Sequence, residues 1–231
     1  MDTVREQRLD YELERMLELQ GEHGLIRFRC ADLSSAEAKA YLASSMSWDV
    51  VESALPGFLS PEAFKRKFPT RAPEKYLIHF GCGGLMKNDA GQIVRTDNHR
   101  LEVVFGLDYP SRPPRLVWLT SIWHPNILKP YLCTEGRPFA IGTALADLCL
   151  DVGAMVQYRN YNVADPLNRE AAEWAKANPR SFPVDPRSLL DARENARALA
   201  ARPSQDHVPA SEDGRRSSWH DLTNSPLIEI L

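Results

Sequence analysis

A chain of 231 residues is long enough to bury one sizeable core and short for two independent ones, so one main domain is expected. The hydrophobic fraction of 43% and charged fraction of 26% are typical of a globular protein, and the net charge of −3 does not favour nucleic acid or an anionic membrane as the main partner. No apolar run reaches the roughly 18 residues that span a bilayer, and the N-terminal segment lacks the pattern of a signal peptide, so we expect a cytoplasmic protein.

The N-terminal part of the chain predicts one helix and one strand. Residues 4–20 show apolar side chains at helical spacing, which predicts an amphipathic helix ending at Gly21. The expected buried face of this helix carries Leu9, Leu13, Met16, Leu17 and Gln20. Residues 25–30 alternate apolar with basic or polar side chains, as a half-buried strand does.

Residues 31–74 differ from their surroundings and are interpreted as a helical insertion. The last of three short helical stretches in it begins with Ser60 as N-cap and Pro61 at the first helical position. Beyond the insertion, further strands are expected at 75–82, 100–107 and 115–120. Because short, turn-rich connections join these strands, we expect a four-stranded antiparallel meander that starts with residues 25–30.

Helices predominate after Cys133. Thr143 is expected to be the N-cap of a helix that ends near residue 156, and two more helices are expected over 166–178 and 185–201. The order of elements predicts an α+β fold in which the helices are segregated from the sheet, within one domain of residues 1–201.

Residues 202–231 are polar and turn-prone, which predicts a flexible C-terminal tail. Its last residues, "SPLIEIL", are apolar. They are interpreted either as a docking motif for a partner's groove or sheet edge, or as a disordered end or a strand that folds back on its own domain.

The four cysteines differ in their surroundings. No CxxC pair occurs, which argues against a zinc site and a disulfide framework. Cys30 and Cys82 lie at expected strand ends and Cys149 lies on the apolar stripe of a helix, so each is explained as a small buried side chain. Cys133 lies in a proline-rich, irregular segment and is expected to be reachable by a partner. Local chemistry leaves open whether Cys133 is a nucleophile.

Four motifs occur in order along residues 109–167. The segment "YPSRPP" (Tyr109–Pro114) is followed by "HPN" (His124–Asn126), by Cys133 seven residues after Asn126, and by "YNVADPL" (Tyr161–Leu167). This order resembles the ubiquitin-conjugating enzymes, whose sheet leads into a YPxxPP segment, an HPN tripeptide and the cysteine that carries ubiquitin. The resemblance implies that family's fold and a set of structural motif residues: Tyr109, Pro110, Pro113, Pro114, His124 and Pro125.

The same resemblance implies a mechanism. Cys133 would accept a ubiquitin-like protein as a thioester from an activating enzyme and pass it to an amine, with no cofactor and no metal. Asn126 would stabilise the oxyanion or brace the cysteine's loop, and Asp165 would orient the incoming amine or accept its proton. A turn or N-cap role for Asp165 stays open. The acceptor and any ligase are not indicated.

The chain also departs from the family pattern. The segment "TEGRPFAIGTALADL" that follows Cys133 contains no tryptophan, and the insertion over 31–74 has no counterpart in the minimal fold. These departures suggest a divergent member, of the kind found in bacterial ubiquitin-like conjugation operons linked to antiphage defence. Arginine outnumbers lysine 21 to 7, which is interpreted as codon bias or as avoidance of self-modification on lysine.

Two other functions are considered. The first is a non-catalytic binding module of the same fold, in which Cys133 is incidental. The second is a cysteine hydrolase that pairs Cys133 with His124 or His79, which requires an imidazole within hydrogen-bond reach of the sulfur.

Overall fold

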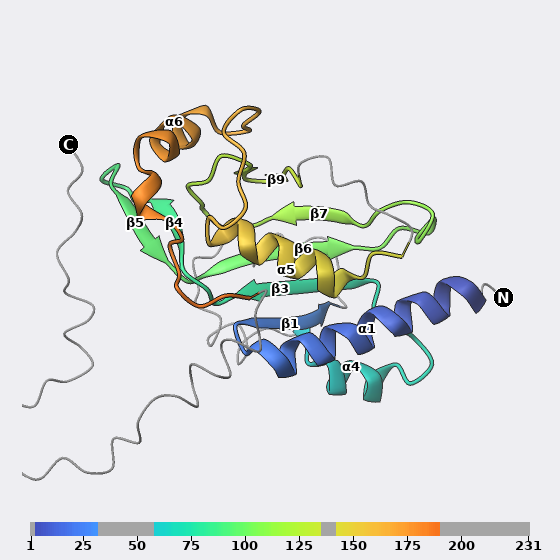
Figure 1. The fold of residues 1–231 in the computed structure, drawn as a ribbon. Coiled ribbons are helices and arrows are strands. Elements are labelled where there is room, and N and C mark those ends of the chain that lie inside the picture. Colours follow the sequence, from blue (N-terminus) through green and yellow to red (C-terminus); the bar gives the residue numbers. More distant parts are fainter. Residues whose placement is uncertain (1–2, 32–57, 135–141, 190–231) are drawn as a thin grey trace, which may run out of the picture.

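The structure is a computed structural model that describes residues 3–31, 58–134 and 142–189 (Figure 1). Residues 32–57 of the predicted insertion, the predicted tail over 202–231 and most of the helix predicted over 185–201 lie outside these residues. The described helices are α1 (Thr3–His23), α4 (Pro61–Lys67), α5 (Leu145–Val156) and α6 (Arg169–Ala177), with a 3₁₀ turn η1 (Pro179–Ser181). The described strands are β1 (Ile26–Ala31), β2 (Phe58–Leu59), β3 (Lys75–Phe80), β4 (Gly84–Lys87), β5 (Ile93–Thr96), β6 (His99–Val104), β7 (Arg115–Trp118), β8 (Ile127–Leu128) and β9 (Tyr131–Leu132).

The main sheet confirms the predicted meander. Its strand order is β2-β1-β3-β6-β7, and every neighbouring pair is antiparallel. The edge strand β2 was not predicted, because two residues are too few to show alternation. The hairpin of β4 and β5 was also missed, since the turn residues between Asn88 and Gln92 dominate the pattern of that segment.

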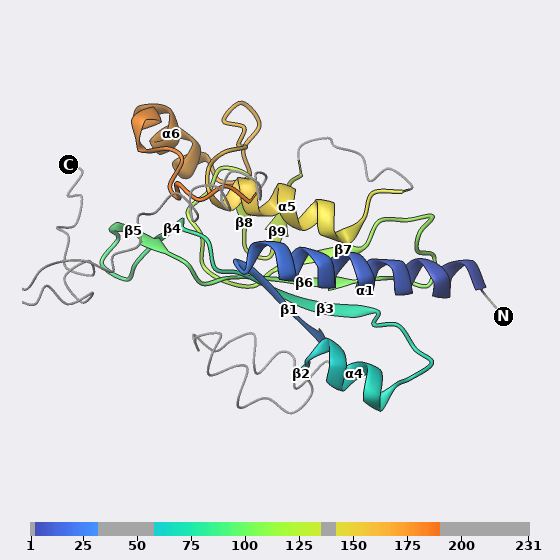
Figure 2. The same ribbon diagram turned by 60° about the horizontal axis from the view of Figure 1, so that its bottom comes forward.

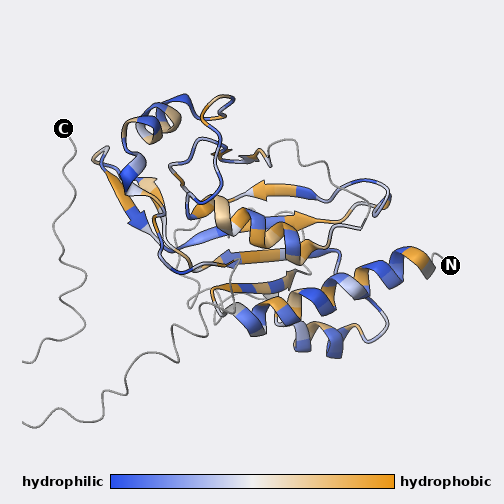
Figure 3. Cartoon of the chain, in the orientation of Figure 1, coloured by the Kyte–Doolittle hydropathy of each residue, from blue (hydrophilic) through white to orange (hydrophobic). Residues whose placement is uncertain are grey.

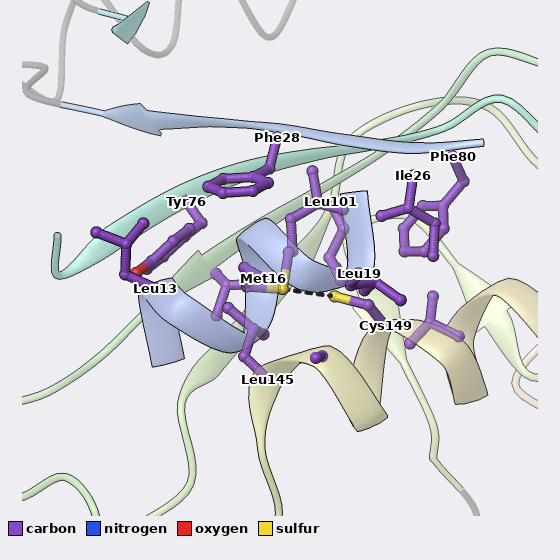
Figure 4. Packing of buried hydrophobic residues seen from close by; sticks show 14 of the residues in the cluster. Leu13, Met16, Leu19, Ile26, Phe28, Tyr76, Phe80, Leu101, Leu145 and Cys149 are labelled. Atoms are coloured by element: carbon purple, nitrogen blue, oxygen red, sulfur yellow. Dashed lines mark hydrogen bonds between the residues drawn. The ribbon is translucent and has the colours of Figure 1, made fainter. Parts of the chain in front are cut away.

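Helices α1 and α5 cover one face of this sheet, which confirms the α+β architecture (Figures 1 and 2). Alternate strand residues point at the helices because side chains alternate between the two faces of a strand. Figure 4 shows Phe28 of β1, Tyr76 of β3 and Leu101 of β6 packed toward α1, with Met16 of α1 against Cys149 of α5. In Figure 3 the apolar residues of α1 are interleaved with polar ones, as an amphipathic helix requires.

The first helix is longer than predicted. It ends at His23, and Gly24 follows with φ +60 and donates its N–H to the Gln20 carbonyl. Gly24, not Gly21, therefore ends the helix, because glycine adopts the left-handed conformation without a steric penalty. The buried face also differs, since Leu17 is 38% exposed whereas Leu19 is 3% exposed.

The observed N-caps of the other helices agree with the prediction at α4 and differ from it at α5. Ser60 caps α4 as predicted, with its hydroxyl accepting from the Ala63 N–H at 3.2 Å. The N-cap of α5 is Ala144 and not Thr143. Residues 185–189, where a third helix was expected to begin, are not helical. Asp185 there accepts bonds from the Gly83 and Arg187 N–H groups, which hold a turn instead. No helix among the described residues is long and apolar enough to cross a membrane.

Candidate active site

Cys133 directly follows the short hairpin of β8 and β9. The Cys133 N–H donates to the Asn126 carbonyl at 2.9 Å, which extends the pairing of the hairpin by one step. Ile127 is fully buried, while Leu128 and Tyr131, which pair across the hairpin, are 43% and 67% exposed. The Trp118 N–H donates to the Pro130 carbonyl at 2.9 Å and attaches the hairpin to β7. Cys133 thus lies on a segment that the main sheet supports.

Exposure separates Cys133 from the other three thiols. Cys133 is partly exposed, whereas Cys30, Cys82 and Cys149 are buried, as predicted. Burial raises the pKa of Cys30 and of Cys82 to about 12 and raises the pKa of Cys149 further. Because the thiolate is the nucleophile, the three buried thiols are poorly placed to react. Cys133 is the thiol that a partner can reach.

The segment Trp123–Asn126 holds the segment 158–168 against the hairpin. The Tyr158 hydroxyl donates to the Trp123 carbonyl, and the Asn168 N–H donates to the Pro125 carbonyl at 2.9 Å. Asn168 is also the N-cap of α6, with its side chain accepting from the Ala171 N–H at 3.1 Å. Asp165 is therefore not the N-cap. It lies between the two anchored ends of the segment.

Asn126 joins the cysteine to this segment at its centre. Its side-chain amide donates to the Asn162 carbonyl at 3.0 Å and accepts from the Asn162 N–H at 2.7 Å. Its own carbonyl accepts from Cys133. The Asn126 side chain is buried, so both of these polar atoms need such partners. In this arrangement Asn126 braces the loops on either side of it.

Asn162 in turn orders the backbone at Asp165. The Asn162 side-chain oxygen accepts from the Ala164 N–H at 2.7 Å and from the Asp165 N–H at 3.4 Å. The Asp165 carboxylate itself is exposed. We did not predict Asn162 as a site residue, although an asparagine that bonds backbone groups two and three residues later is a known turn signal.

His124 is enclosed by the same loops. It is fully buried, its Nδ1 accepts from the Asn126 N–H at 3.0 Å, and its ring centroid lies 4.6 Å from that of Tyr158. Burial lowers the pKa of His124 to about 3, so the ring is neutral at physiological pH. No hydrogen bond to the Cys133 sulfur occurs among the described residues, so this geometry gives no support to a cysteine and histidine pair.

Tyr109 joins the loop after β6 to helix α1. Its hydroxyl donates to the Glu12 carboxylate and accepts from the Arg8 guanidinium at 3.2 Å. Glu12 is fully buried and also accepts from the Leu145 N–H at 2.6 Å, at the first turn of α5. We did not predict this network, because Arg8 and Glu12 look like the solvated face of an amphipathic helix. Of the prolines in the same motif, Pro114 is buried, Pro110 is half-buried and Pro113 is exposed.

Metal ligands do not gather in the described part of the chain, where no group of three or more His, Cys, Asp and Glu side chains is arranged to hold an ion.

Comparison with known proteins matches the segment of the chain that contains these motifs. Residues 84–187, which contain the motif and site residues named above, match the family model for ubiquitin-conjugating enzymes. A NEDD8-conjugating enzyme of Eremothecium gossypii is 27% identical over 99 residues, covering 42% of this chain and 54% of that protein. A Nedd8-conjugating enzyme of Drosophila melanogaster is 32% identical over 78 residues, covering 33% and 43%. The chain thus spans about half the length of the curated relatives it matches.

Solved structures give weaker likenesses. The E2 domain of a Toxoplasma gondii ubiquitin-conjugating enzyme is 21% identical, covers 48% of this chain and 75% of that chain, and has a TM-score of 0.35. A structure described as a ubiquitin-conjugating enzyme of Plasmodium yoelii is 16% identical, covers 80% and 91%, and has a TM-score of 0.46. These structural scores add nothing to the sequence match. The family model and the curated relatives support a place in the ubiquitin-conjugating enzyme family.

Proposed function

We propose that this chain is a conjugating enzyme that accepts a ubiquitin-like protein from an activating enzyme as a thioester on Cys133 and transfers it to an amine. The observation that carries the proposal is the partly exposed Cys133 thiol, bonded through its backbone to Asn126, in a chain whose other three thiols are buried. The match of residues 84–187 to the family model supports the same function.

Charging requires the Cys133 sulfur to attack the thioester on the activating enzyme. The Cys133 sulfur attacks as the thiolate, which is the reactive form of a thiol. The exchange is feasible because the leaving group is also a thiolate. The carbon–sulfur bond to Cys133 forms as the bond to the activating enzyme breaks, and no cofactor takes part.

Transfer requires a neutral amine beside the thioester. A lysine has a reference pKa of about 10.4, so less than about one in a thousand is neutral at pH 7. We assign Asp165 the role of orienting the amine or accepting its proton, supported by the fixed backbone on both sides of it. We assign Asn126 the bracing role, because an oxyanion role would require its bond to the Asn162 carbonyl to open. His124 is a structural residue in this scheme.

The test is an adduct assay with purified activating enzymes, ATP and two probes, NEDD8 and ubiquitin. NEDD8 is included because the curated relatives are named as NEDD8-conjugating enzymes. The wild-type chain should form an adduct that reductant removes, and Cys133→Ala should form none. Cys133→Ser should give an oxyester that survives reductant. An adduct that persists unchanged in Cys133→Ala would contradict the proposal, as would the absence of an adduct with NEDD8, with ubiquitin and with a ubiquitin-like protein encoded beside this gene.

We also propose that the enzyme acts in the cytoplasm of a bacterium, in a conjugation operon for antiphage defence. The support is the divergence from the family pattern together with the excess of arginine over lysine. The genes beside this one decide the matter. Neighbours that encode an activating enzyme and a ubiquitin-like protein are expected, and unrelated neighbours in a bacterial genome would contradict it.

A further inference from the structure

The lysines of this chain are few, and those the structure describes are mostly engaged. Lys39 lies outside the described residues. Among the six described lysines, five contact a partner: Lys65 pairs with Asp10, Lys75 with Glu102, Lys87 with Glu170, Lys176 with Glu173, and Lys67 lies over the Phe68 ring. The sixth, Lys129, is exposed and has no such partner among the described residues.

Lys129 lies on the same hairpin as the proposed nucleophile. Leu128 and Tyr131 form the last pair of β8 and β9, so Lys129 and Pro130 make the turn. Cys133 continues β9 at the other end of the hairpin. With a rise of about 3.3 Å per residue, three steps separate the level of Cys133 from the turn, which is roughly 10 Å.

An exposed face of the hairpin lies between Lys129 and Cys133. Side chains two positions apart on a strand share a face, so Cys133 and Tyr131 point the same way, as does Leu128 across from Tyr131. The two intervening side chains are uncharged and exposed, and the opposite face buries Ile127. The Trp118 N–H holds the turn at the Pro130 carbonyl, and the bond from the Cys133 N–H to the Asn126 carbonyl closes the open end of the hairpin. The lysine stem is a flexible chain of four carbon atoms, so the Lys129 amine can sample positions along this face.

We propose that Lys129 is an internal acceptor, to which the enzyme transfers the ubiquitin-like protein carried by its own Cys133. This inference rests on the proposed function. The neutral Lys129 amine attacks the thioester carbonyl, a carbon–nitrogen bond forms, and the carbon–sulfur bond breaks with its electron pair remaining on the Cys133 thiolate. The amine's proton passes to solvent. The product is an isopeptide that reductant does not cleave, attached beside the thiol that formed it.

The reaction is intramolecular, which sets its kinetics. An acceptor tethered on a short segment has an effective concentration on the order of millimolar, far above the concentration of enzyme in an assay. The fraction of enzyme modified per unit time is therefore independent of dilution. A large excess of Cys133→Ala chain, which keeps Lys129 but carries no thioester, does not become modified by charged wild-type enzyme.

The experiment follows two adducts on the full chain, using whichever of NEDD8 and ubiquitin charges Cys133. Non-reducing gels report the thioester, and reducing gels with tandem mass spectrometry report the isopeptide and its position. Lys129→Arg should keep the thioester at wild-type level and lower the isopeptide by about tenfold or more, since arginine stays protonated. The matched control Lys176→Arg, on the exposed side of α6, should change neither adduct.

The outcomes separate the two proposals. Suppose that wild type and both lysine variants form the thioester. An isopeptide that is absent, that is attached to another lysine, or whose formation depends on dilution would then overturn the internal acceptor and leave the proposed function intact. The absence of a thioester with NEDD8, with ubiquitin and with a ubiquitin-like protein encoded beside this gene would overturn the proposed function and this inference together. Because Lys129→Arg must still form the thioester, its own charging reports that the variant is folded.

Discussion

At the residue scale, two asparagines, Asn126 and Asn162, hold the loops of the site together through hydrogen bonds to the main chain. Asn126 bonds the main chain of Asn162 and the main chain of Cys133, while the Asn162 side chain bonds the main chain near Asp165. Main-chain bonds at Asn162 do not require its side chain. The two residues are therefore separable by mutation: Asn126 holds the loops together, and the Asn162 side chain shapes the turn at Asp165.

We expect Asn162→Ala to slow transfer from Cys133 by about tenfold while charging of Cys133 changes little, because losing hydrogen bonds worth about 1 kcal/mol each loosens the Asp165 turn alone. Single-turnover discharge of the thioester to free lysine measures this. Asn160→Ala is the matched control, since that asparagine lies in the same segment and its side chain makes no bond with the described residues. Equal slowing in both variants would contradict the role assigned to Asn162.

Thiol reactivity gives a second test at this scale. In the folded chain we expect one of the four cysteines, Cys133, to react quickly with a thiol reagent, since burial protects the others and raises their pKa. All four should react after unfolding. A colorimetric thiol titration of wild type and Cys133→Ala reads this directly, and rapid labelling of the Cys133→Ala chain would be the contrary result.

At the element scale, α1 completes the N-terminus of α5. The N-cap Ala144 has no polar side chain, so the first N–H groups of α5 need other acceptors. Asp147 accepts from the Ala144 N–H at 3.3 Å, and Glu12 of α1 accepts from the Leu145 N–H at 2.6 Å. Glu12 also binds Arg8 and Tyr109, so one buried carboxylate joins two helices and the loop after β6.

We expect Glu12→Ala to lower the free energy of unfolding by about 3 kcal/mol or more, because it leaves Arg8, Tyr109 and the Leu145 N–H without their shared acceptor. Glu14→Ala is the control on the same helix, where the side chain is exposed and the change should be within about 0.5 kcal/mol. Urea unfolding of both variants measures the difference. Similar stability of the two would show that the Glu12 network contributes little.

At the scale of the whole molecule, three buried histidines make stability depend on pH. Burial lowers the pKa of His79 and of His124 to about 3 and that of His99 to about 4. Arg27 and Arg100, directly opposite His79 on the neighbouring strands, lower the pKa of His79 further. An unfolded histidine takes up its proton near pH 6.5. Between these values the unfolded chain binds more protons than the folded chain.

The histidine contribution to the free energy of unfolding should therefore be fully present above about pH 7. The free energy of unfolding should decrease as the pH drops from 6.5 toward 4, by up to about 1.4 kcal/mol per pH unit for each histidine. The pKa of Asp185, lowered to about 2 by its bonds to Arg187 and Gly83 against the effect of its burial, adds a loss only below about pH 4. Urea midpoints between about pH 7.5 and 5 measure the slope. His99→Gln should reduce that slope, and a flat profile across this range would contradict the assignment.

The sequence by itself determined what depends on neighbouring residues. Alternation in β1, β3, β6 and β7 predicted the meander, Ser60 and Pro61 predicted the start of α4, and burial of three cysteines followed from their places on strands and a helix. The order of the motifs indicated the resemblance to ubiquitin-conjugating enzymes before any geometry, because such motifs are read from residue types and spacing alone. Prolines near Cys133 were sufficient to predict a reachable thiol.

Only the tertiary structure decided the pairings between distant residues. Asn126 and Asn162 are joined by two bonds, and Glu12 and Leu145 by one, although each pair is far apart in the chain. Such bonds leave no periodic pattern in the sequence. A buried charged residue on a helix, such as Glu12, also has the same kind of neighbouring residues in the sequence as a solvent-exposed one. The position of Lys129 relative to Cys133 also follows from the pairing of β8 with β9, two strands too short to be recognised from alternation. Burial and hydrogen-bond partners are properties of the packed molecule, and the roles proposed for the site residues rest on them.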